Sequence, residues 1–98
     1  MSARLFTIVS EFRGTTNVSQ VRAFNECDAV RAWTELLIEE RPFKVASSYL
    51  AKSVASDMAE YPPVALNGLT NAWCITGSCG GDFMLADIIE TVSLANGS

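Results

Sequence analysis

The chain has 98 residues, of which 49% are apolar and 18% are charged, and its formal net charge at pH 7 is −4. This composition excludes a disordered chain and is sufficient for one hydrophobic core, so we expect a single domain over residues 1–98. The acidic balance argues against nucleic acid as a partner, and the lack of a long apolar run argues against a membrane span, so we expect a cytoplasmic protein.

The first predicted element is a β-hairpin. Apolar side chains recur with a period of two along residues 4–13, which is typical of a strand. Gly14 supplies the positive φ of a turn, and residues 17–24 form the return strand, which places Phe6 opposite Val21. The strand face opposite to that of Phe6 carries Leu5, Thr7 and Val9.

Two helices are predicted after this hairpin. Asn25 is a favourable N-cap, and apolar residues then recur at helical spacing as far as Pro42, which disfavours helical geometry in the residue before it. The second helix is expected from about Ala46 to Glu60, and it ends before Pro62.

A second hairpin is predicted near the end of the chain. Residues 72–78 and 82–92 read as strands, and Gly80 and Gly81 form the two-residue loop between them. This register turns Trp73 toward the core. With residues 64–71 as a connector, the predicted fold is an α+β two-layer sandwich of order ββααββ, in which two helices pack on one face of a four-stranded, mostly antiparallel sheet.

The cysteines do not form a pattern that indicates chemistry. Cys74 and Cys79 are five residues apart on one strand, so they point to opposite faces about 16 Å apart, too far for a disulfide. The chain has no histidine, which removes both the commonest zinc ligand and the usual general base. Cys27 lies between two acids and is read as an inert thiol. We therefore expect no metal, no cofactor and no catalytic site.

The face of the sheet turned away from the helices is the candidate site. A water-facing antiparallel surface is usually more polar than this one, and a contiguous exposed apolar area usually marks an interaction site. Two possibilities would remove the site: the faces are reversed, or the connector 64–71 covers the patch. The predicted interface residues are Leu5, Thr7, Val9, Cys74, Thr76, Phe83, Leu85 and Ile89.

The function expected from this surface is protein interaction or assembly without catalysis, through a homodimer, because isologous pairing is the commonest form of association. A second hypothesis is an acidic antitoxin or immunity protein that neutralises a basic partner, because residues 53–98 hold five acids and no base. A shallow site for a small apolar ligand is a third hypothesis. A fourth is an enzyme that uses carboxylates or Lys52 in a cleft between helices and sheet.

Overall fold

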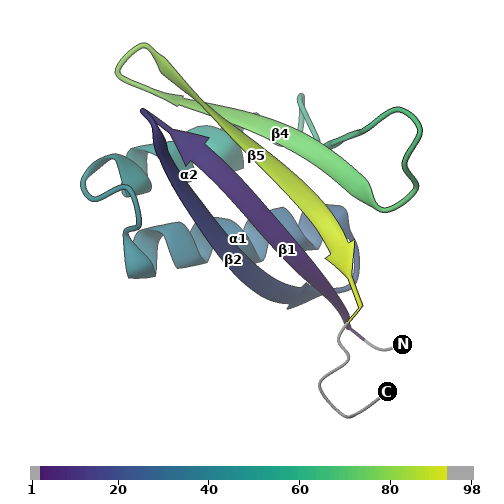
Figure 1. Cartoon of the computed structure of the whole chain (residues 1–98). Helices are drawn as coiled ribbons and strands as arrows, with labels where there is room; N and C mark the ends of the chain where they lie inside the picture. Colours follow the sequence, from purple (N-terminus) through teal and green to yellow (C-terminus); the bar gives the residue numbers. More distant parts are fainter. Residues whose placement is uncertain (1–2, 93–98) are drawn as a thin grey trace.

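The computed structural model describes residues 3–92, and in this range the chain forms one antiparallel sheet with two helices on one of its faces (Figure 1). The strand order across the sheet is β2-β1-β5-β4-β3. In chain order the elements are β1 (Arg4–Phe12), β2 (Thr15–Ala23), α1 (Glu26–Glu40), α2 (Ala46–Asp57), β3 (Val64–Ala65), β4 (Ala72–Cys79) and β5 (Asp82–Thr91).

The α+β class, the antiparallel sheet and the pair of helices on one face agree with the prediction, but the number of strands does not. The connector 64–71 contains a fifth strand, so the order is ββααβββ rather than ββααββ. In β3, Val64 pairs with Cys74, and Ala65 pairs with Trp73. A strand of two residues is too short to show an alternating pattern, which is why the sequence did not reveal it.

Both predicted hairpin registers are confirmed. Phe6 pairs with Val21 in the first hairpin, and Cys79 pairs with Asp82 in the second. The glycines of both turns have positive φ, +80° at Gly14 and +60° and +83° at the two glycines of the second turn, as primed or left-handed turn positions require.

The helix boundaries follow from local hydrogen bonds. The side chain of Asn25 caps α1, because its Oδ1 accepts a hydrogen bond from the Asp28 backbone N–H at 2.8 Å. Arg41 ends the helix in the left-handed region, with φ of 53°, and its N–H donates to the Leu37 carbonyl. The predicted end of α2 at Glu60 is wrong, because the residues after Asp57 form a turn.

The core lies between the sheet and the helices. Gly77 in β4 lets α2 approach closely, because a Cβ at this position would lie 2.9 Å from Cγ2 of Val54. The largest side chains that are completely enclosed in the core are Phe6, Ile8, Val30, Trp33, Leu37, Leu50, Val54, Met84 and Ile88.

Candidate interaction surface

The side of the sheet that faces away from the helices is named the outer face. It is formed by alternate residues of each strand, whose neighbours in sequence point into the core, as Met84 and Ala86 do on either side of Leu85. This arrangement excludes both of the possibilities that would have removed the site. The faces are not reversed, and β3 extends the sheet beside β4 rather than folding over it.

The structure places all eight predicted interface residues on the outer face. They come from the three inner strands β1, β5 and β4, and their cross-strand pairs bring them side by side, for example Thr7 with Ile89 and Thr76 with Leu85. The eight residues are Leu5, Thr7, Val9, Cys74, Thr76, Phe83, Leu85 and Ile89.

Several large apolar side chains on this face are open to solvent. Phe83 is 80% exposed, and Leu85 is 45% exposed, whereas Leu5, Val9 and Ile89 are partly covered by their neighbours. Polar residues are usual on the solvated side of an antiparallel sheet. The exposed apolar groups therefore form a surface whose burial by another molecule is favourable.

A carboxylate lies in the middle of the outer face. Asp87 on β5 pairs with Val9 on one side and with Cys74 on the other, and the next residues outward in the same row are Val18 and Val64. The side chain of Asp87 is only partly exposed. The ion pairs among residues 3–92 engage the carboxylates of Asp28, Asp82 and Glu90, and none engages Asp87.

One predicted interface residue already has partners within the chain. Oγ1 of Thr7 lies 2.6 Å from Oγ1 of Thr91 and accepts a hydrogen bond from Nε2 of Gln20 at 3.0 Å. These contacts form a short polar row across β2, β1 and β5. Thr7 is therefore a less attractive docking group than the apolar residues around it, because its hydroxyl is already satisfied.

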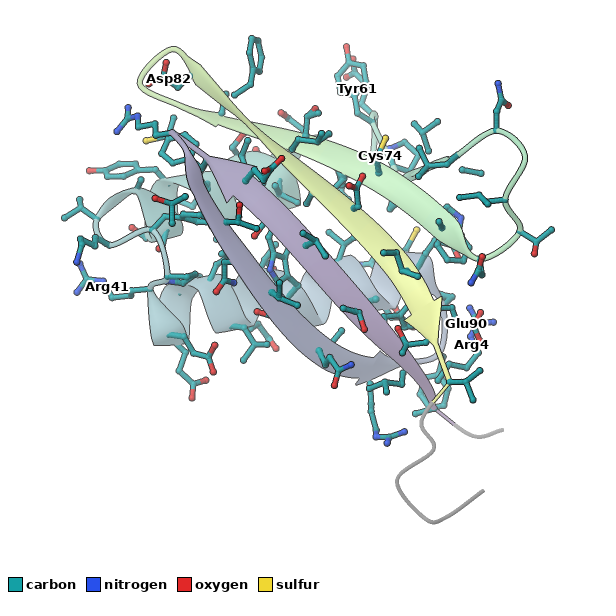
Figure 2. The ribbon with its side chains drawn as sticks, in the orientation of Figure 1. Arg4, Arg41, Tyr61, Cys74, Asp82 and Glu90 are labelled. Carbon is teal, nitrogen blue, oxygen red and sulfur yellow. The ribbon has the colours of Figure 1, made fainter. Side chains whose placement is uncertain are left out.

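Residues at both edges of the surface were missed by the sequence-based prediction. Val18 on β2 is 60% exposed and pairs with Val9, a pairing that the Arg13–Gly14 turn implies. At the opposite edge, Val64 of β3 joins Tyr61 and Cys74 around a shallow depression of about 210 Å³. Figure 2 shows Tyr61 and Cys74 close together there. The connector has no periodicity that would have indicated this edge.

A second depression lies between α2 and the tip of the β4–β5 hairpin. It has a volume of about 750 Å³, and its lining includes Tyr49, Lys52 and Cys79. The Ser78 backbone N–H donates to Oγ of Ser53 at 3.1 Å beside it. Tyr49 and Lys52 are exposed, so this depression is open to water and is not the buried polar pocket that a catalytic role for Lys52 needs.

The cysteines are placed as their spacing predicts. Cys74 lies on the outer face, and Cys79 belongs to the opposite side of β4, where it contacts the core. Cys27, Cys74 and Cys79 are all free thiols. Among residues 3–92, no three Cys, Asp or Glu side chains gather closely enough to hold a metal ion.

Within the described part of the chain, neither helix has the length and apolarity needed to cross a membrane.

No protein-family model, curated protein or solved structure matches this chain. The outer face, with its exposed apolar side chains around a central carboxylate, is therefore the feature from which a function is inferred.

Proposed function

We propose that this protein is a small interaction module without catalytic activity, and that it assembles as a homodimer through the outer face of its sheet. The observation that carries this proposal is the exposure of Phe83 and Leu85 on the strand at the centre of the sheet. Exposure of such apolar side chains to water is unfavourable, and the free energy of the system falls when they are covered.

The outer face is close to the size of one side of a stable dimer interface. Its four long strands have eight to ten residues, so they are about 30 Å long and together span about 19 Å, which gives a face on the order of 600 Å² before the two-residue β3 is added. A typical specific interface buries about 800 Å² on each partner. Burial of one Phe or Leu contributes about 1.5–3 kcal/mol, so a few such side chains favour association by several kcal/mol.

The charges support a homodimer through the outer face over the acidic antitoxin or immunity hypothesis. Asp82 pairs with Arg13, and Glu90 pairs with Arg4, which lies beside it in Figure 2. Two of the five acids after residue 52 are therefore already engaged within the chain. The remaining three are Asp57 and Glu60 at and just after the end of α2, and Asp87 on β5, so they do not come from one element. A neutraliser of a basic protein needs one acidic surface.

The hypothesis of a small apolar ligand rests on the depression beside Tyr61. Its volume of about 210 Å³ lies below the 300–1,000 Å³ that small-molecule sites usually occupy. An apolar sheet face bordered by a shallow depression is better suited to another protein surface than to a small molecule.

The proposal is tested by Leu85→Glu, measured by size-exclusion chromatography with light scattering. We expect the wild-type protein to elute as a dimer and Leu85→Glu to elute as a monomer, because two copies would bury the new charges. The matched control is Ile38→Glu on α1, since Ile38 is 54% exposed on the helical layer. Equal effects of the two substitutions, or a wild-type protein that is monomeric, would contradict the proposal.

A further inference from the structure

We propose that Asp87 forms an ion pair with Arg22 of the partner subunit, so that each copy completes the outer face of the other. This inference rests on the proposed homodimer and names the residues that determine its pairing. Two of these contacts arise in one dimer, because a two-fold axis relates them.

Asp87 needs a cation from outside its own chain once the outer face is covered. Its flanking neighbours in the row are Val9 and Cys74, and its neighbours along the outer face of β5 are Leu85 and Ile89. While this face is in water, the carboxylate is hydrated. Once the face is covered, the carboxylate loses that water, and an unpaired charge in such a place strongly opposes association.

Arg22 is the cation that the outer face offers. Among the strand residues of the described sheet that point outward, it is the one basic side chain, and it is exposed near the end of β2. The ion pairs within residues 3–92 involve Arg4, Arg13 and Arg31 and leave Arg22 unpaired.

The two charges do not meet within one chain. Asp87 pairs with Val9, which pairs with Val18, and Arg22 is four residues further along β2. The Cα atoms of Asp87 and Arg22 are therefore about 16 Å apart, because they are separated by two strand spacings across the sheet and by four residues along it. This distance is more than the two side chains span together. The complementary charges are therefore in position to pair between copies and not within one.

The self-complementarity distinguishes a second copy from partners of a different sequence. The outward strand residues of the described sheet include two carboxylates that no ion pair engages, Glu11 and Asp87, and one unpaired cation, Arg22. Glu11 is exposed and accepts a hydrogen bond from Oγ1 of Thr16 at 3.3 Å, whereas Asp87 is partly buried among apolar neighbours, so Asp87 is the anion that needs a partner once the face is covered. Asp87 and Arg22 lie at separate positions, and both gain a partner when the face meets a copy of itself in a suitable orientation. A basic partner would pair with Asp87 but would leave Arg22 opposed by like charge. The charge arrangement thus favours a homodimer over the basic protein considered from the sequence.

Charge reversal tests the pairing. Arg22→Glu alone places two acids together twice in each dimer, and Asp87→Arg alone places two bases together twice, so we expect each variant to raise the dimer Kd by about 100-fold or more. In a heterodimer formed from a one-to-one mixture of the two variants, one contact joins the unchanged Asp87 of one subunit to the unchanged Arg22 of the other. The second contact joins the two substituted positions, which carry opposite charges as well. We therefore expect a heterodimer with an affinity close to that of the wild type, detected by native mass spectrometry because the two variants differ in mass.

Three outcomes are informative. A heterodimer from the mixture, with both variants monomeric alone, supports the pairing. Variants that dimerise like a dimeric wild type, or that stay monomeric when mixed, overturn the pairing but leave the proposed homodimer intact. A wild-type protein that is monomeric throughout overturns the homodimer itself. Circular dichroism verifies that each variant is folded, and Arg22→Asp with Asp87→Lys provides a second pair with the same logic if either first variant fails to fold.

Discussion

Arg13 donates its Nε–H to Oδ2 of Asp82 at 2.7 Å, and this contact joins the turn of the β1–β2 hairpin to the start of β5. The guanidinium also lies over the ring of Phe12, 4.7 Å from its centroid, and its Nη2 lies 3.4 Å from the Cys79 carbonyl oxygen. One side chain thus connects the two hairpins at the same end of the sheet. Both partners are about half exposed, with side-chain exposures of 51% and 56%.

The exposure of this pair limits its contribution to stability. A double-mutant cycle with Arg13→Ala and Asp82→Ala should give a coupling of about 0.2–1 kcal/mol, because solvent screens the charges. Arg13→Ala alone should cost more than Asp82→Ala, since it also removes the stacking on Phe12. Urea unfolding at low and high salt measures both, and the coupling should decrease in high salt. A coupling of several kcal/mol would contradict the expectation that solvent screens this contact.

Gly77 is required by the packing of α2 against β4. In Gly77→Ala the new Cβ would lie 2.9 Å from Cγ2 of Val54 and 3.2 Å from Cε of Met84. Overpacking of this kind should lower the free energy of unfolding by about 1–3 kcal/mol. Chemical denaturation measures the loss.

The control for this prediction is a double-mutant cycle that combines Gly77→Ala with Val54→Ala. Val54→Ala alone removes buried methyl groups and destabilises the protein. In the double variant with Gly77→Ala the methyl groups no longer clash, so the cost should be smaller than the sum of the two single costs. Strictly additive effects would mean that Val54 is not what opposes a side chain at position 77.

Ser47 has a structural role at the start of α2. Its hydroxyl oxygen accepts a hydrogen bond from the Phe43 backbone N–H at 2.8 Å, and the side chain is completely buried. Ser47→Ala should destabilise the protein by about 1–3 kcal/mol, because the Phe43 N–H is left without a partner. Ser48→Ala, at the exposed neighbouring serine, should change stability by less than about 0.5 kcal/mol. Equal thermal shifts for the two variants would contradict this role.

The turns made much of the fold predictable. Gly14 and Gly80 set the registers of the two hairpins, and these registers determine which side chains face outward. The outer-face residues of β1, β4 and β5 could therefore be named from the alternation alone. The Asn25 side chain likewise marked the start of α1 through a local hydrogen bond.

Features that depend on contacts between distant parts of the chain were not predictable in this way. Arg13 and Asp82 are 69 residues apart and meet because β1 pairs with β5, and the strand order is not encoded in the alternation of either hairpin. Val64 reaches the outer face through a two-residue strand that pairs with β4. The isolation of Asp87 also required the structure, since it depends on which cations the neighbouring strands place near it.

The most direct test of the central claim is sedimentation equilibrium of the wild-type protein over a range of concentrations. A homodimer through the outer face predicts a mass that rises to twice that of one chain and an equilibrium that shifts to the monomer in Leu85→Glu. A mass of one chain at every concentration up to the millimolar range would show that the exposed Phe83 and Leu85 do not bring two copies together.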